Sequence, residues 1–185
     1  MGANRTLTSK GESIKNMTNQ SPSITILIAE DDLDYQVLLQ NAFVEIGQEI
    51  QLFFVRDGVD LLNFLRCQGK YTPPAFAPRP DLILLDLNLP RKDGRASLAE
   101  IKGDHDLRSI PVVVLTASSS EEDILYTYNL GGAGFIIKPD TFKGLVEVVK
   151  GLNQYWFEVV ELVNDEYVNS VLHSHSTSPS SRNAN

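Results

Sequence analysis

Four apolar runs of this chain end in polar side chains whose combined chemistry suits the transfer of a phosphoryl group. These side chains belong to Glu30-Asp31, Asp86, Thr116 and Lys138. Carboxylates that lie close together repel one another, and a hard cation such as Mg²⁺, which takes oxygen ligands, relieves that repulsion. Asp86 would then be a nucleophile toward phosphorus, and Thr116 and Lys138 would hold the phosphoryl oxygens. Histidine and cysteine are absent from these positions, which argues against zinc.

Each of these residues also has an ordinary structural role, so only their combination is informative. An Asp at a strand end usually forms a turn, and an acidic pair before a helix usually stabilises the helix N-terminus. A Thr in a buried strand usually fills space as a β-branched residue. A Lys before Pro is usually a solvated surface charge. The four positions must therefore meet in space before the chemical interpretation holds.

The scaffold that would bring them together is predicted by alternating apolar runs and helical patterns. Short runs of branched apolar residues favour strands that are buried on both faces. Residues with apolar spacing i, i+3, i+4 and i+7 follow these runs and favour helices. Five strands, each followed by a helix, predict a parallel sheet with helices on both faces, and such sheets bind ligands at the carboxyl ends of their strands. The strands are expected at 24–29, 51–55, 82–85, 112–115 and 135–137.

The last helix is expected to begin near Thr141 and to continue as far as Val163. Its first half would cover the sheet, whereas its distal half has nothing left to cover. Leu152, Trp156 and Val159 are therefore predicted to form a symmetric contact in a homodimer. The alternative is that the distal half folds back onto its own domain.

Composition limits the partners and the compartment of the protein. The 185 residues, 42% of them hydrophobic, are enough for one domain with a sizeable core. The net charge of −8 disfavours nucleic acids and anionic membranes, because phosphate groups would repel the chain. No apolar stretch approaches the ~18 residues that span a bilayer. The single cysteine, Cys67, excludes an internal disulfide and fits a reducing compartment, so a cytoplasmic location is expected.

Three regions are expected along the chain. Residues 1–22 and 164–185 are polar and lack periodicity, so both ends are predicted to be disordered. Residues 23–163 would form one folded domain that includes the long last helix. No folded output domain follows it in this sequence.

Local motifs around the four strand ends resemble those of the receiver domain of two-component response regulators. The motifs are Ile26–Asp32, Asp86–Pro90 with Asp93-Gly94, Leu115–Ala117 and Phe135–Pro139. The resemblance covers roughly residues 24–160. It implies the (βα)5 flavodoxin-like receiver fold, with a parallel five-stranded sheet in the order 2-1-3-4-5 and helices on both faces.

The resemblance implies a role for each residue of the acidic cluster. Asp86 would be the residue that becomes phosphorylated. Asp31 would bind Mg²⁺ directly, Glu30 often through water, and Asp86 would complete the set of carboxylates. The backbone carbonyl of Asn88 would be a further ligand, and Asp32 an auxiliary acid.

The resemblance also implies how phosphorylation would act on the rest of the domain. Thr116 and Lys138 would bind the phosphoryl group, and Phe135 would be the switch aromatic that fills the space Thr116 vacates. Because Phe135 has no hydroxyl to hold it outward, we expect it to favour the inward rotamer even before phosphorylation; the alternative is an ordinary core residue. The Lys138–Pro139 peptide bond should be cis, which proline makes inexpensive.

A narrower similarity is to the small response regulators of cyanobacterial phytochromes. It rests on residues 85–95, on the proline-containing loop before the third strand and on Tyr155-Trp156-Phe157. It implies phosphorylation by a phytochrome-type sensor histidine kinase and formation of a dimer. Signalling would use the surface of the fourth helix, fifth strand and fifth helix; the alternative is a phosphorelay intermediate or a phosphate sink.

Two other classes of protein compete with this interpretation. A phosphatase or transferase of the haloacid-dehalogenase type carries Asp-x-Asp on its first strand, whereas here the candidate nucleophile is on the third strand and position 88 is Asn. A receiver-like interaction module would make no use of Asp31, Asp86, Thr116 and Lys138, all of which are present. We therefore expect no enzyme, but Mg²⁺-dependent self-phosphorylation and autodephosphorylation alone.

Overall fold

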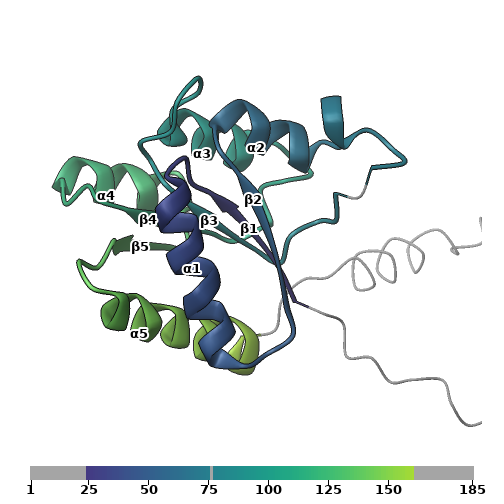
Figure 1. Cartoon of the computed structure of the whole chain (residues 1–185). Helices are drawn as coiled ribbons and strands as arrows, with labels where there is room; N and C mark the ends of the chain where they lie inside the picture. Colours follow the sequence, from purple (N-terminus) through teal and green to yellow (C-terminus); the bar gives the residue numbers. More distant parts are fainter. Residues whose placement is uncertain (1–23, 76, 161–185) are drawn as a thin grey trace, which may run out of the picture.

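The computed structural model describes residues 24–75 and 77–160, which form one parallel sheet with helices on both sides (Figure 1). The order of the strands is β2-β1-β3-β4-β5, and all neighbouring pairs are parallel. This order confirms the predicted (βα)5 flavodoxin-like fold. The strands are β1 (Ile24–Ala29), β2 (Ile50–Val55), β3 (Leu82–Leu85), β4 (Val112–Thr116) and β5 (Gly134–Ile137).

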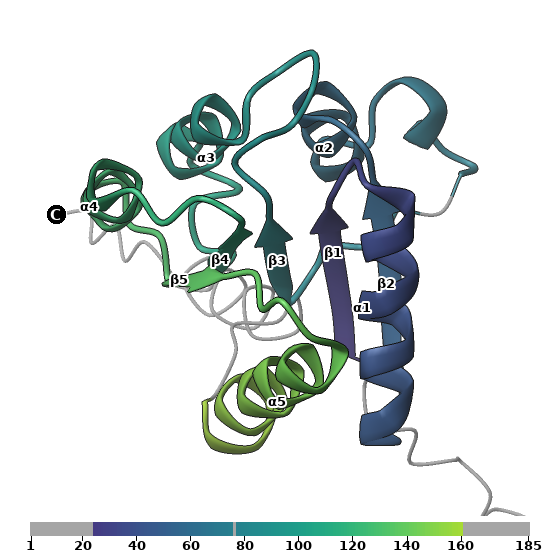
Figure 2. The ribbon, with the colours of Figure 1, turned by 60° about the vertical axis from the view of Figure 1, so that its left-hand side comes forward.

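The two faces of the sheet have separate cores. Helices α1 and α5 pack on one face and helices α2 and α3 on the other, while α4 lies toward the β5 side of the sheet (Figure 2). Strands β1 and β3 are buried almost throughout, which explains why their sequences are apolar without alternation. The helices are α1 (Leu33–Ile46), α2 (Gly58–Leu65), the 3-10 turn η1 (Gly69–Tyr71), α3 (Gly94–Gly103), α4 (Glu121–Asn129), α5 (Phe142–Asn153) and the π-helical turn η2 (Gln154–Val159).

Short polar residues and glycine set the ends of α1, which follows the acidic pair. The N-cap is Asp32, whose side chain accepts from the N–H groups of Asp34 and Tyr35. Gly47 ends the helix in the left-handed conformation with φ of 72°, which only glycine adopts without steric cost. The β1–α1 connection is thereby held directly beside the predicted site.

Helix α3 begins against the backbone of the predicted phosphoacceptor. A Cβ atom on Gly94 would lie 2.1 Å from the carbonyl oxygen of Asp86, so no other residue fits without a backbone shift. The Gly94 N–H donates to the carbonyl of Leu87 at 2.9 Å. The glycine eight positions after Asp86 therefore closes the β3–α3 connection tightly around the site.

The last helix is shorter than predicted. After α5, the π-helical turn η2 ends at Val159, and Val160 is extended, so the helix does not continue unbroken toward Val163, which lies outside the described residues. Two successive β-branched residues, Val159-Val160, disfavour continuation of a helix.

The predicted dimer contact is correspondingly reduced. Leu152 is 6% exposed and belongs to the core between the sheet and α5, so it is not accessible to a second copy. Trp156 is partly buried against the same core, as the fold-back alternative predicted. Val159 is 69% exposed and is the most accessible of the three residues.

The predicted disorder of residues 1–22 and 164–185 concerns segments outside the described residues. Within the described part of the chain, no helix has the length and apolar character needed to cross a membrane.

Candidate functional site

The register of the sheet brings the predicted residues to one edge. Ala29 pairs with Leu85, so the residues that follow them, Glu30 and Asp86, lie side by side. The Asp86 N–H donates to the Ala29 carbonyl at 3.0 Å. On the other side of β3, the Lys138 N–H donates to the carbonyl of Thr116 at 2.8 Å, just past the last paired residues of β4 and β5. The four predicted strand ends therefore meet, as the chemical interpretation requires.

The acidic cluster has the composition of a divalent-cation site. One carboxylate oxygen from each of Glu30, Asp31 and Asp86 lies within 4.8 Å of the others. Glu30 and Asp86 are buried, whereas Asp31 is exposed and gives the cluster access to solvent. Burial of Glu30, and secondarily the charge of Asp86, raise the pKa of Glu30 despite the nearby Lys138. An all-oxygen set of crowded carboxylates fits a hard divalent cation.

Lys138 neutralises the buried part of this cluster. Its Nζ lies 2.6 Å from Asp86 Oδ2 and 2.6 Å from Glu30 Oε2, and its side chain is 14% exposed. Burial alone would lower the pKa of Lys138, but the hydrogen bonds to Asp86 and Glu30 outweigh burial and raise it. The ammonium is therefore charged and fixed within contact of the candidate nucleophile.

Hydrogen bonds fix the Asp86 carboxylate and the Thr116 hydroxyl separately. The backbone N–H of Asn88 donates to Asp86 Oδ1 at 3.0 Å, while Lys138 holds the other oxygen, so the orientation of this carboxylate is set from both sides. Thr116 is fully buried, and its Oγ1 accepts from the N–H of Ser118 at 3.4 Å.

Phe135 is partly buried and packs against the core on the α2/α3 face of the sheet. This position is compatible both with a switch aromatic and with an ordinary core residue. Its movement on phosphorylation therefore stays a prediction.

The expected cis bond before Pro139 is wrong. Among the described residues the cis peptide bond is Pro73–Pro74, and Lys138–Pro139 is trans. A bond before proline prefers trans by only about 0.5–1 kcal/mol, so the residue types alone do not determine the isomer.

Two side chains of helix α1 belong to the site although nothing in their sequence positions indicated it. The Gln36 side-chain amide donates to the Glu30 carbonyl at 2.6 Å. Lys138 Nζ lies 4.5 Å from the centroid of the Tyr35 ring. Tyr35 lies in the first turn of α1, and helical spacing does not distinguish a core ring from a ring at the edge of a site.

A second network that the sequence did not reveal connects α3 to α4. Arg95 donates through Nε and a terminal nitrogen to the two oxygens of Asp123, at 2.6 Å each. The Ser118 hydroxyl donates to the same carboxylate at 2.6 Å. The loop that follows Thr116 is thus connected to the start of both helices.

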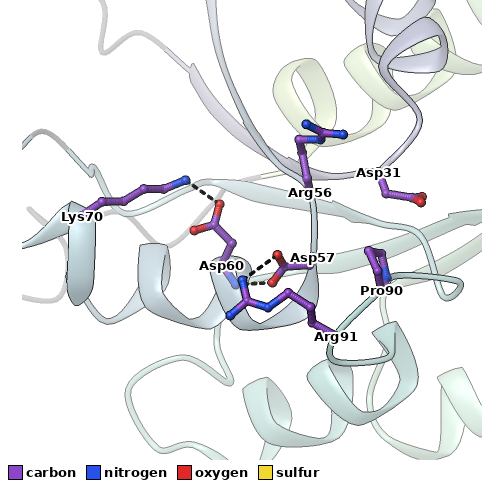
Figure 3. A pocket seen from close by; sticks show the side chains of 7 residues that line it. All are labelled: Asp31, Arg56, Asp57, Asp60, Lys70, Pro90 and Arg91. Carbon is purple, nitrogen blue, oxygen red and sulfur yellow. Dashed lines mark hydrogen bonds and ion pairs between the residues drawn. The ribbon is translucent and has the colours of Figure 1, made fainter.

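A hollow of about 400 Å³ adjoins the acidic cluster at Asp31 (Figure 3). Two ion pairs form between residues that line it, Arg91–Asp57 at 3.0 Å and Lys70–Asp60 at 2.8 Å. The remaining lining residues are Arg56 and Pro90. This hollow is the polar surface next to the solvent-accessible side of the cluster.

Comparison with known proteins identifies the family. The family model described as "Response regulator receiver domain" matches residues 26–150. The chain belongs to this family. Its place among response regulator receivers separates it from the phosphatases with Asp-x-Asp on the first strand.

Relatives of this receiver include response regulators of phytochromes. The chain is 42% identical over 147 residues to "Response regulator Rcp1" of Synechocystis sp., covering 79% of this chain and 98% of Rcp1. The crystal structure of the phosphorylated cyanobacterial phytochrome response regulator RcpA is 41% identical, with a TM-score of 0.72, and covers 77% of this chain and 99% of RcpA. The Mn²⁺-bound form of Rcp1 is 42% identical, with a TM-score of 0.70, over 76% of this chain and 99% of the Rcp1 chain. That form of Rcp1 binds a divalent cation, and in this chain the Glu30, Asp31 and Asp86 carboxylates form a cluster that could hold one.

Proposed function

We propose that this response regulator receives a phosphoryl group on Asp86 from a phytochrome-type sensor histidine kinase. The observation that supports this most directly is the contact of Lys138 Nζ with both Asp86 and Glu30 at 2.6 Å, at the edge of a three-carboxylate cluster. A lysine that is already bound to the nucleophile's own carboxylate is in place to contact the incoming group.

The transfer would exchange one bond to phosphorus for another. The bond between the kinase histidine nitrogen and phosphorus breaks, and a bond from an Asp86 carboxylate oxygen to phosphorus forms, giving an acyl phosphate. Lys138 would contact one phosphoryl oxygen, and the Thr116 hydroxyl would donate to another. The approach would be from the side of Asp31 and its hollow, where the cluster is accessible.

Mg²⁺ is the proposed cofactor. The Glu30, Asp31 and Asp86 carboxylates and the Asn88 carbonyl would hold it. When bound, it would neutralise charge that develops on the transferring group. The exposed side chain of Asp31 supports direct binding, whereas the burial of Glu30 beside Lys138 supports a contact through water.

Similarity to Rcp1 and RcpA supports a phytochrome-type kinase as the partner. Location in the cytoplasm follows from this partnership, because the kinase takes its phosphoryl group from ATP. The net charge of −8 supports the exclusion of nucleic acids and anionic membranes as partners.

The surface formed by α4, β5 and α5 is the proposed output. Large apolar side chains remain exposed on each of these elements, namely Leu125, Tyr126, Tyr128, Ile137 and Phe142. Phosphorylation would change this surface through Thr116 and Phe135. Homodimer formation is proposed as well, with Val159 and the accessible part of Trp156 at the contact. A relay intermediate or a phosphate sink would use the same chemistry with different partners.

Phosphotransfer from a purified, phosphorylated phytochrome-type kinase tests the proposal. In the presence of Mg²⁺, the wild-type chain should take up the label and Asp86→Ala should not. Asp106→Ala is the matched control, because Asp106 is an exposed acid outside the cluster, and it should accept the label at the wild-type rate. Equal labelling of wild type and Asp86→Ala would disprove the assignment of Asp86.

A further inference from the structure

The Lys138 ammonium has an aromatic neighbour in addition to its two carboxylates. Nζ lies over the Tyr35 ring, 4.5 Å from its centroid, while it contacts Glu30 and Asp86. A cation within about 6 Å of an aromatic face is attracted by the negative potential of that face. Lys138 is thus held from three sides, and two of the three holding groups are metal-site carboxylates.

The ring itself is fixed by the local structure of α1. The Tyr35 N–H donates to the capping carboxylate of Asp32 at 3.2 Å, which places the residue in the first helical turn. Its side chain packs against the core on the α1/α5 face of the sheet. Burial, together with the charges of Glu30 and Asp86, raises the pKa of the Tyr35 phenol, so the ring stays neutral. A neutral ring attracts the ammonium without acting as a further anionic ligand.

The three holding groups differ in what happens to them during phosphorylation. The carboxylates of Glu30 and Asp86 would be engaged by the divalent cation and by the phosphoryl group, so they can no longer hold Lys138 as they do here. The Tyr35 ring takes no part in either interaction. It is the holding group that persists while the ammonium moves from the carboxylates to a phosphoryl oxygen.

We propose that Tyr35 is a positioning residue that keeps the Lys138 ammonium beside Asp86 through the face of its ring. This inference rests on the proposed function and adds to it a residue that lies far from Lys138 in the sequence. The hydroxyl of Tyr35 is not needed for this role: its oxygen is buried and has no hydrogen-bond partner among the described residues. The aromatic face alone should matter.

The test measures the affinity of the full chain for beryllofluoride, a phosphoryl mimic, in the presence of Mg²⁺. Tyr35→Leu should weaken binding by about two- to thirtyfold, the range that corresponds to a cation–π contact. Tyr35→Phe keeps the ring and should bind as the wild type does. Replacement of Tyr35 by phenylalanines with one, two and three ring fluorines should weaken binding stepwise, because fluorine reduces the negative potential of the face while changing the ring's size little.

A purely structural role would not produce that stepwise response. Equal affinities across the fluorinated series, or a Tyr35→Phe variant as weak as Tyr35→Leu, would overturn the inference. If the wild-type chain itself bound no beryllofluoride, the proposed function would fail and the inference with it. If the wild type bound beryllofluoride and all fluorinated variants bound it with the same affinity, the inference alone would fail.

The Mn²⁺ affinity of the unphosphorylated chain gives a second, independent measurement. A tyrosine ring face is not a ligand for Mn²⁺, and Lys138 would compete with the cation for Glu30 and Asp86. Tyr35→Leu should therefore bind Mn²⁺ as tightly as the wild type or more tightly. Weaker Mn²⁺ binding would mean that the leucine variant distorts the acidic cluster, which would contradict a role confined to the ammonium.

Discussion

Arg95 at the start of α3 and Asp123 in the first turn of α4 form a two-point ion pair, with both nitrogen–oxygen distances at 2.6 Å. Asp123 is 7% exposed, so its charge depends on this partner and on the Ser118 hydroxyl. Ser118 follows Thr116 by two residues, and its N–H donates to the Thr116 hydroxyl oxygen. One carboxylate therefore connects the helix after the proposed phosphoacceptor to the helix of the proposed output surface.

Loss of this pair should destabilise the domain. Arg95→Met keeps the aliphatic stem but removes both charged hydrogen bonds to Asp123, together with the contact of Arg95 with the exposed Asp93. It leaves Asp123 buried with Ser118 alone. The free energy of unfolding should fall by about 1.5–3 kcal/mol, the range for hydrogen bonds to charged groups. Urea denaturation measures it. Arg108→Met, at an exposed arginine, is the control and should stay within about 0.5 kcal/mol of wild type. A loss no larger than that of the control would show that the pair does not contribute.

The same pair should make stability depend on acidity in a defined range. The hydrogen bonds from Arg95 and then Ser118 hold the pKa of Asp123 below its usual value. A lowered pKa in the folded state stabilises the fold above the unfolded-state pKa, about 3.9 for Asp, and this contribution disappears as the pH falls through the folded-state pKa. The stability difference between wild type and Asp123→Asn should thus be constant from about pH 7 to about 5 and shrink below about 4. A difference that grows as the pH falls would contradict this assignment.

The sheet and much of the site could be predicted because local patterns determine them. Apolar runs mark the buried strands, and the residue after each run must then lie at the carboxyl edge, which is how Asp86 and Lys138 were found. The contacts of Tyr35 with Lys138 and of Arg95 with Asp123 join residues far apart in sequence, and neither helical spacing nor charge indicates such pairs. Leu152 shows the same limit of sequence-based prediction. Its spacing assigns it to an apolar helix face, but the spacing does not reveal which part of the protein covers that face.

Gly94 should be irreplaceable at the start of α3. In Gly94→Ala the new Cβ would lie 2.1 Å from the Asp86 carbonyl oxygen, so the backbone of Asp86 must shift. We expect a loss of about 1–3 kcal/mol in unfolding free energy, as for overpacking elsewhere, and weaker beryllofluoride binding. Gly103→Ala is a matched control on the same helix, because a Cβ atom added there would meet nothing within 4 Å. Equal stability of the two variants would refute the close approach.

Asp31 should govern cation affinity without governing stability. Asp31→Asn removes the exposed carboxylate of the acidic cluster, so Mg²⁺ and Mn²⁺ should bind at least about tenfold more weakly, a change of roughly 1.4 kcal/mol. The midpoint of urea unfolding, measured without metal, should barely change, because the Asp31 side chain is exposed. Asp34→Asn serves as the control, since Asp34 is an exposed acid of the first turn of α1 outside the cluster. Titration calorimetry measures both affinities, and equal values in the two variants would exclude Asp31 as a ligand.

Val159 provides the sharpest test of the proposed dimer. Truncation of the last helix would also remove Trp156, which packs against the core, so a point substitution is preferable. Val159 is 69% exposed, and Val44 on α1 is a matched valine at 72%. If the distal turn forms the contact, Val159→Asp should shift the chain toward monomer in sedimentation equilibrium, because a buried unpaired charge at an interface is costly. Val44→Asp should leave the association unchanged. If only Val44→Asp shifts the chain toward monomer, the interface lies on α1 instead. If neither variant changes the association, neither α1 nor the distal turn forms the interface.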